Sequence, residues 1–424
     1  MSSQDQLPNL TLSAQDHLQV QIDKFAEENP LSEEAIREAS SAIPGGTTRA
    51  ILLHTPFPPV FVGGKECFLK SVDGREYLDF VSEYCAGMFG HSHPRINEAI
   101  EGVLRAGHTL GGPTPKEGEL AKAITKRFPS MDAIRFCNSG TEANTLALAT
   151  ALAYSQRKKI LVFENGYHGG TLSFSRHNPL LLPHQFVYGR YNDRERTRVD
   201  IDVGAILIEP LQGAGGMVPS QNEFLKYLRE EATRVGAVLI FDEVVSSRLY
   251  YGGMQEYYGV TPDMTTIGKH FGGGFSFGAF GGKKEIMSLY APGAPRGLYH
   301  SGTWNNNVFT MTAGVVATDL LSRENIEKTN SLGDALRNGM QELVNSNEAA
   351  RSLINFKGFG SVIGISFNGP SSVQLRDLFF FYLLNNGVYV GHRGFFALNL
   401  THKQEHVDGV LDLFRAFLKR YMAE

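Results

Sequence analysis

The stretch Gly236-Ala237-Val238-Leu239-Ile240-Phe241-Asp242 decides the fold class, because an unbroken apolar run ends there in a carboxylate. A short strand that is apolar on both faces is typical of a parallel sheet covered by helices on both sides. Between about Pro94 and Gly282, further short apolar runs alternate with helical patterns, at residues 133–137, 160–163, 205–208, 265–267 and 278–280. This alternation predicts an α/β fold whose large domain is built on a mostly parallel sheet.

The two ends of the chain have a different pattern. Two strand-like runs at residues 67–70 and 76–80 are separated by Asp73-Gly74, a strong hairpin signal, and a helix is expected to start at Ser32. After about Met311, an amphipathic helical stretch leads to expected strands at 362–367 and 387–390 and to a final helix near 407–421. We therefore expect residues 81–310 to form the large domain, and residues 1–80 and 311–424 to form a smaller α+β lobe.

Composition excludes several classes of function. The 424 residues are 42% hydrophobic and carry a formal net charge of −4, with no basic stripe for nucleic acid. No apolar run of about 18 residues and no signal-peptide pattern is present, so we expect no membrane binding and a cytosolic location. The three scattered cysteines fit reduced thiols, and His91-Ser92-His93 has no third residue spaced to complete a metal site.

Residues suited to chemistry follow the expected strands, where open α/β sheets bind their ligands. Asn138-Ser139-Gly140-Thr141 leads from a strand into an alanine-rich helix, so free backbone N–H groups and the helix dipole favour a bound anion such as phosphate. An ordinary Ser/Thr helix cap is the alternative for this turn. Tyr167 follows the strand that ends at Phe163 and could stack on a flat ring or simply line a rim.

Asp242 and Lys269 are the candidates for catalysis. Asp242 ends a buried strand and needs a cationic partner, either an Arg or Lys across the fold or the protonated nitrogen of a bound pyridine ring. Lys269 follows the expected strand at 265–267 and precedes Gly272-Gly273-Gly274, which leaves room for a ligand. A lysine becomes a nucleophile for Schiff-base chemistry when its pKa is lowered, and its position after Asp242 favours this role over that of a solvated surface lysine.

Taken together, these residues resemble class III aminotransferases of pyridoxal-phosphate (PLP) fold type I, from roughly Pro44 to near the C-terminus. The resemblance rests on Gly90-His91-Ser92-His93-Pro94, Asn138-Ser139-Gly140-Thr141-Glu142-Ala143, Tyr167-His168-Gly169, Glu209-Pro210, Phe241-Asp242-Glu243-Val244, Gly268-Lys269 and Gly302-Thr303. It implies a PLP-dependent transaminase that is a homodimer with shared active sites.

The resemblance also implies a role for each residue of the cofactor site. Lys269 carries PLP as a Schiff base, and Asp242 pairs with the ring nitrogen. The phosphate is held by Ser139, Gly140 and Thr141, with Thr303 contributed by the partner subunit. Tyr167 stacks on the ring, Val244 packs behind it, and Glu209 lies near it.

Within the class, the chain is most similar to glutamate semialdehyde aminomutases and, closer still, to β-amino-acid (β-phenylalanine type) aminotransferases. The segments that favour the second group are residues 43–49, 242–248, 302–307 and 393–395. In that branch, arginines matching Arg49 and Arg393 bind the carboxylates of donor and acceptor. We expect apolar neighbours to surround Arg393, while a structural ion pair is the alternative for either arginine.

The expected reaction is transamination of a hydrophobic or aromatic β-amino acid, with 2-oxoglutarate or pyruvate as acceptor. Three alternatives stay open: an amine transaminase acting on carboxylate-free amines, a glutamate-semialdehyde-type aminomutase, and a catalytically idle protein of the same fold that acts as a binding module.

Overall fold

The computed structural model describes residues 13–175 and 178–422. Its largest sheet has seven strands in the order β4-β12-β11-β10-β7-β5-β6. Their bounds are β4 (Ala133–Cys137), β12 (Gly278–Gly282), β11 (Met264–Gly268), β10 (Val238–Asp242), β7 (Val203–Ile208), β5 (Lys159–Phe163) and β6 (Gln185–Gly189). Strand β12 runs antiparallel to both of its neighbours, β4 and β11, and the other pairs are parallel, so the sheet is mostly parallel, as expected.

The helices around this sheet are α3 (Pro94–Ala106), α4 (Pro115–Arg127), α5 (Gly140–Ser155), α6 (Asn222–Val235), α7 (Met254–Tyr258), α8 (Lys284–Met287) and α9 (Val308–Leu320). Leu161 and Phe163 of β5 belong to the core cluster that contains α6, whereas Ile160 and Val162 belong to the cluster that contains α5. Because successive side chains of a strand point to opposite faces, both faces of the sheet are covered, and this explains the unbroken apolar runs.

All six strands predicted for this sheet are present, with ends that differ by at most two residues. The sequence missed β6, which lies at the edge of the sheet and has a partly exposed burial pattern. An edge strand that is not covered on both faces has no reason to be uniformly apolar, so β6 lacks the signal that marked the others.

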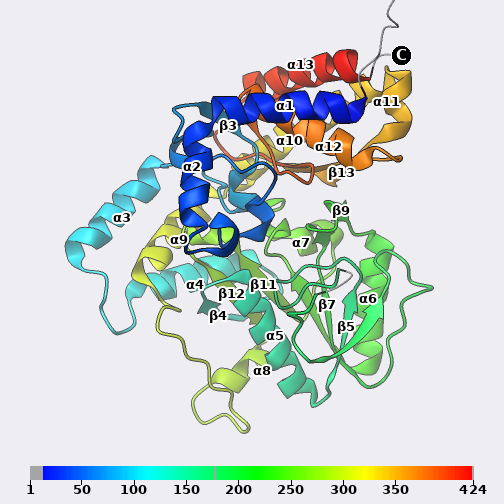
Figure 1. Cartoon of the computed structure of the whole chain (residues 1–424). Coiled ribbons are helices and arrows are strands. Elements are labelled where there is room, and N and C mark those ends of the chain that lie inside the picture. The colour runs from blue at the N-terminus through cyan, green and yellow to red at the C-terminus, as the bar shows by residue number, and fades with distance from the viewer. Residues whose placement is uncertain (1–12, 176–177, 423–424) are drawn as a thin grey trace, which may run out of the picture.

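Both ends of the chain share a second core. Phe25 and Tyr77 from the N-terminal part pack in one cluster with Phe379 and Phe414 from the C-terminal part. The elements are α1 (Ala14–Glu28), α2 (Pro30–Ala39), β1 (Phe61–Lys65), β2 (Phe68–Ser71), β3 (Glu76–Asp79), α10 (Arg323–Asn345), α11 (Glu348–Leu353), β13 (Ile354–Phe359), β14 (Val362–Phe367), α12 (Ser372–Asn385), β15 (Val388–Tyr389), β16 (Phe395–Ala397) and α13 (Gln404–Tyr421). Figure 1 shows the blue and red ends of the chain together above the green sheet.

The second helix begins at Pro30, two residues before the predicted start at Ser32. Proline is favoured in the first turn of a helix, and the cap comes from another element. Asp73, in the hairpin between β2 and β3, accepts a hydrogen bond from the backbone N–H of Leu31 at 2.7 Å. Buried Ser32 donates its hydroxyl proton to the same carboxylate. A cap supplied from 42 residues away cannot be recognised in a local pattern.

Across the described ranges, no helix combines the length and the hydropathy needed to cross a membrane.

Candidate active site

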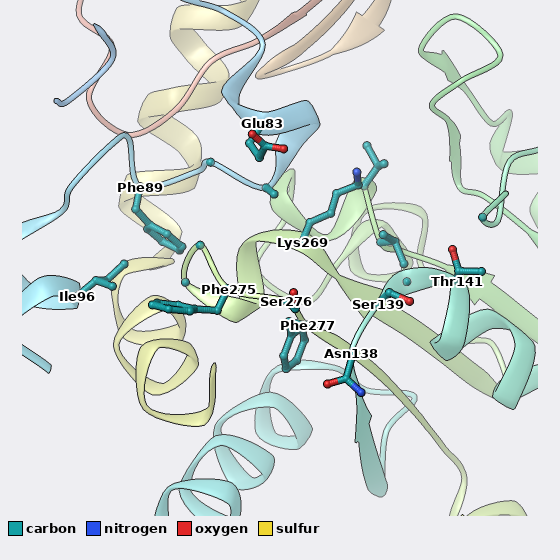
Figure 2. A pocket seen from close by; sticks show the side chains of 18 of the residues that line it. Glu83, Phe89, Ile96, Asn138, Ser139, Thr141, Lys269, Phe275, Ser276 and Phe277 are labelled. Atoms are coloured by element: carbon teal, nitrogen blue, oxygen red, sulfur yellow. The ribbon is translucent and has the colours of Figure 1, made fainter. Parts of the chain in front are cut away.

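A cavity of about 840 Å³ opens beyond the carboxyl ends of β10 and β11. Eight of the predicted site residues line it: Ser139, Gly140, Thr141, Tyr167, Glu209, Asp242, Val244 and Lys269. Figure 2 shows Lys269 between the segment that carries Glu83 and the turn that carries Ser139 and Thr141, while Phe89 and Phe275 face each other at the other end. The cavity therefore joins a polar region around Lys269 to an apolar region.

The polar region includes the N-terminus of α5. Ser139 is the N-cap residue, and its hydroxyl accepts a hydrogen bond from the backbone N–H of Glu142 at 3.1 Å. The first N–H groups of a helix have no intrahelical acceptor, so those of Gly140 and Thr141 suit an anion. Gly169 has φ +121° and approaches Thr141 so closely that a Cβ atom would lie 2.3 Å from the Thr141 hydroxyl oxygen. The Tyr167 turn is thus packed directly on this anion site.

Asp242 is 5% exposed and is held by three donors. Its Oδ2 accepts hydrogen bonds from Asn144 Nδ2 at 2.8 Å and His168 Nδ1 at 2.7 Å, and its Oδ1 accepts one from the backbone N–H of Val244 at 3.0 Å. Burial opposes charging of His168, but the hydrogen bond and the charge of Asp242 outweigh it and raise the His168 pKa. Of the two cationic partners considered for Asp242, an Arg or Lys across the fold is not found among the described residues, and the charged side chain beside Asp242 is the buried His168.

Glu209 follows β7 and holds the turn that carries Tyr167. Its Oε2 accepts a hydrogen bond from the backbone N–H of Tyr167 at 3.0 Å, and its Oε1 accepts one from Gly213 at 3.0 Å. Burial raises the pKa of Glu209 to about 7. Tyr167 itself is 48% exposed, so one face of its ring is available to a ligand in the cavity.

Lys269 begins the turn after β11 with a left-handed φ of 52°, which is uncommon for a side chain of this size and is typical of functional sites. Its Nζ donates a hydrogen bond to the backbone oxygen of Tyr84 at 2.8 Å. Burial lowers the Lys269 pKa, and the nearby charge of Arg49 acts in the same direction. Lys269 is therefore an amine with an enlarged neutral fraction, as a nucleophile requires.

The two arginines lie beside the cavity and are not part of its lining. The guanidinium of Arg49 forms an ion pair with Glu83 and sits 5.3 Å from the centre of the Tyr84 ring. Burial raises the pKa of Tyr84, while the charges of Arg49 and Arg393 both act to lower it, so Arg393 also lies near this tyrosine. The Tyr84 ring stacks on Phe395 with centroids 5.8 Å apart.

The expectation of apolar surroundings for Arg393 was wrong, because its side chain is exposed. Its neighbours in sequence, from Phe395 to Leu398, are buried. Arg393 instead occupies the turn before β16 and projects away from them. It makes no ion pair with any residue that the structure describes.

Thr303 does not reach the α5 N-terminus within one chain. It lines a separate hollow of about 650 Å³ with His108, Pro113 and Trp304. The sequence prediction assigned Thr303 to the site of a partner subunit, and that assignment stays a prediction.

Sequence reasoning missed Asn144, His168, Glu83 and Tyr84. A polar residue on the otherwise apolar face of the α5 helix was a usable signal for Asn144, and the position next to Tyr167 was one for His168. Glu83 and Tyr84 had no comparable signal, because their importance depends on contacts with Arg49 and Lys269, far away in sequence.

The donor set fits PLP. A helix N-terminus suits the phosphate, a carboxylate fixed by three hydrogen bonds suits a ring cation, and an amine with a lowered pKa suits an aldehyde. All three line one cavity, and Tyr167 and Val244 add flat and apolar surfaces to it.

Comparison with known proteins gives the same assignment. The model of the family "Aminotransferase class-III" matches residues 54–179 and 189–418. The chain is 40% identical to a β-phenylalanine transaminase of Variovorax paradoxus over 93% of this chain and 94% of that protein. The crystal structure of the β-phenylalanine aminotransferase from that organism aligns with a TM-score of 0.91 at 39% identity, over 96% of this chain and 98% of that one.

Two other relatives have different activities in their names. An ω-transaminase from Sphaerobacter thermophilus aligns with a TM-score of 0.86 at 33% identity, over 92% and 98% of the two chains. A glutamate-1-semialdehyde 2,1-aminomutase of Methanothermobacter thermautotrophicus is 34% identical over 90% of this chain and 97% of its own. With the family model covering most of the sequence, this chain belongs to the class III aminotransferases of fold type I and is a PLP-dependent enzyme.

Proposed function

We propose that the enzyme transfers the amino group of a hydrophobic or aromatic β-amino acid to a keto acid, 2-oxoglutarate or pyruvate. The observation that carries this proposal is the placement of Arg49 and Arg393 around Tyr84, whose backbone oxygen accepts the hydrogen bond from Lys269. Guanidinium groups beside the tyrosine whose backbone oxygen holds the reactive amine suit substrates whose carboxylate lies a short distance from the amino group. The apolar end of the cavity, with Phe89 and Phe275, supports a hydrophobic side chain on the donor.

In this proposal Lys269 has two tasks. It would hold the cofactor covalently, and once freed by the incoming amine its Nζ would be placed to take a proton from the amine-bearing carbon and to give one back. PLP supplies the aldehyde that takes up the amino group and the ring that accepts the electron pair. Asp242, fixed by His168 and Asn144, would supply the charge that keeps the ring nitrogen protonated. Tyr167 and Val244 would cover the two ring faces, and Glu209 fixes the Tyr167 turn.

The phosphate would be bound by Ser139, Gly140 and Thr141, with Thr303 of a second subunit. The position of Thr303 in a hollow outside the main cavity supports a homodimer in which Thr303 reaches the phosphate of the other subunit. We also retain as proposals the division at residues 80 and 310 into a large PLP-binding domain and a smaller lobe, and a cytosolic location.

An amine transaminase is the second candidate. The ion pair between Arg49 and Glu83 favours this candidate. Because Glu83 already pairs with the guanidinium of Arg49, a substrate carboxylate would have to displace Glu83 to bind there. An aminomutase is the third candidate, supported by the semialdehyde aminomutases among the relatives.

The test is a panel of donors, each given to the PLP-loaded enzyme in a single half-reaction followed by cofactor absorbance. The donors are 3-amino-3-phenylpropanoate, 1-phenylethylamine and glutamate 1-semialdehyde, with pyruvate and 2-oxoglutarate as acceptors in the reverse half-reaction. We expect the β-amino acid to react with the highest kcat/KM. If 1-phenylethylamine or the semialdehyde is the best substrate, the corresponding alternative replaces the proposal.

A further inference from the structure

The turn that carries Arg393 is fixed at its base and not at its tip. Gly394 donates its N–H to the backbone oxygen of Gly391 at 2.8 Å, and the backbone oxygen of Gly394 accepts the N–H of Ile365 at 2.7 Å. At Gly394, which has φ +81°, a Cβ atom would lie 2.2 Å from the Ile365 oxygen. His392 and Arg393 occupy the tip, where neither makes a backbone hydrogen bond to another described residue.

His392 anchors this tip through its side chain. Its Nε2 pairs with Asp377 Oδ1 at 3.0 Å, and its ring packs edge-on against Phe380 with centroids 4.8 Å apart. Asp377 lies on α12 and also accepts hydrogen bonds from Arg376 Nε and Nη2, at 2.9 and 2.8 Å. Burial would raise the pKa of Asp377, but His392 and Arg376 outweigh it and lower that pKa, so a carboxylate is maintained as the anchor.

His54 lies on the other side of the His392 ring and supplies packing alone. The two ring centroids are 5.3 Å apart, and neither nitrogen of His54 has a hydrogen-bond partner in the described structure. Burial and the neighbouring His392 lower the His54 pKa to about 4, so it is a neutral ring at ordinary pH. The cluster thus contains one histidine that bonds to Asp377 and one that does not.

Consecutive residues therefore point in different directions. His392 is half-buried against α12, whereas Arg393 is exposed and acts on Tyr84 beside the cavity. The hydrogen bond between Gly394 and Gly391 closes the turn, and the side chain of His392 ties its tip to α12 through Asp377 and Phe380.

We propose that His392 is a positioning residue for carboxylate recognition, since its bond to Asp377 fixes the turn that presents Arg393 to the substrate. This inference rests on the proposed function, in which Arg393 binds a substrate carboxylate. Without the bond, Arg393 is still present but its side chain can adopt other directions. Binding of the acid must then order the Arg393 side chain, and this entropy cost weakens the affinity. The proton transfers at Lys269 do not involve His392, so the chemical rate is unaffected.

The test compares His392→Ala, His392→Gln, Arg393→Ala and the double variant His392→Ala/Arg393→Ala in the PLP-loaded enzyme. Single-turnover half-reactions give a limiting rate and an apparent dissociation constant for each substrate: 3-amino-3-phenylpropanoate with the PLP form, and 2-oxoglutarate and a carboxylate-free aldehyde with enzyme whose cofactor has first been converted to the pyridoxamine form. For the acid that depends on Arg393, we expect His392→Ala to raise the dissociation constant about threefold to tenfold at an unchanged limiting rate. Glutamine can donate to Asp377, so His392→Gln should restore most of the affinity.

His54→Leu is the matched control, because it changes the other histidine beside Phe380 and replaces a neutral ring that makes no hydrogen bond with an apolar side chain. It should leave the affinity for the acid unchanged. The double variant should bind the acid as poorly as Arg393→Ala alone, since a residue acting only through Arg393 has nothing left to position. Additive losses, equal losses for the aldehyde, a failure of His392→Gln to restore binding, or a matching loss in His54→Leu would each overturn the proposal. If Arg393→Ala itself binds both acids normally, the carboxylate role of Arg393 fails first, and that result is distinct from a failure at His392.

Discussion

Replacing Asp242 by Asn should slow proton removal strongly and leave the fold largely intact. Asp242 is almost fully buried, so its charge is poorly screened and acts strongly on a cation that binds beside it. A nearby opposite charge shifts a pKa by about 1–3 units, and one unit corresponds to about 1.4 kcal/mol. If the reaction requires the protonated ring, the limiting rate of the donor half-reaction should fall about tenfold to a thousandfold.

The same substitution has a separate structural cost. All three groups around Asp242 are donors, so an amide can accept from only part of the set, and its own NH₂ then faces another donor. We expect a loss of about 1–3 kcal/mol in the free energy of unfolding, measured by urea denaturation.

Asp263→Asn is the matched control for this experiment. Asp263 is also buried, accepts the backbone N–H of Leu239 at 2.8 Å and pairs with Arg229 and Lys283, but it lies at the opposite end of β11 from Lys269. It should lose stability without a comparable loss of rate. A limiting rate in Asp242→Asn within threefold of the wild-type value, or equal slowing in Asp263→Asn, would refute the assignment.

Four further outcomes are expected. Lys269→Ala should abolish turnover while the protein still binds PLP through the phosphate, which absorbance and equilibrium dialysis will show; near-normal turnover would remove Lys269 from its role. Gly169→Ala should weaken PLP binding at least tenfold, because a Cβ atom cannot fit beside Thr141; an unchanged dissociation constant would contradict this. Folding raises the Glu209 pKa from its ordinary 4.5 to about 7. The contribution of Glu209 to the free energy of unfolding is therefore complete below pH 4.5 and is lost as the pH rises to 7. Glu209→Gln should therefore gain stability relative to wild type by up to roughly 3 kcal/mol between pH 4.5 and 8 in urea titrations of the cofactor-free protein, and a constant difference would argue against the raised pKa. Arg49→Ala and Arg393→Ala should each lose about tenfold to a hundredfold in kcat/KM for a different acid and much less for 1-phenylethylamine, and equal losses on all substrates would refute carboxylate binding.

The cofactor region could be predicted from sequence because its residues follow directly after strands. Once β10 and β11 are recognised as neighbouring parallel strands, Asp242 and Lys269 must lie at the same edge of the sheet. The N-terminus of α5 lies at that edge for the same reason, because it follows β4, which pairs with β12 beside β11. Local patterns were sufficient to bring these groups together.

The same reasoning could not find the partners of these groups. His168 was visible in the sequence beside Tyr167, yet its bond to Asp242 depends on how the turn after β5 folds back over α5, where Gly169 contacts Thr141. Likewise, the direction of Arg393 depends on a turn that packs on Ile365 of β14. Apolar neighbours along the sequence predicted a buried Arg393, but in a tight turn adjacent residues point in different directions.

If Arg49 and Arg393 bind the substrate acid as proposed, cofactor chemistry and substrate recognition depend on different kinds of contact. Lys269 and Asp242 are fixed by adjacent strands of one sheet. Arg49 and Arg393 lie near Tyr84 and belong to segments that pack against the second core, with α1, α12 and β14. The backbone oxygen of Tyr84, which accepts the hydrogen bond from Lys269, joins the two groups directly. A substitution at His392 or Asp377 can thus change which acid is bound without disturbing Asp242. A substitution at His168, in contrast, removes a hydrogen bond to Asp242. Such a separation would allow members of one family to differ in the substrates that their names give, as the β-phenylalanine transaminase and the glutamate-1-semialdehyde aminomutase do.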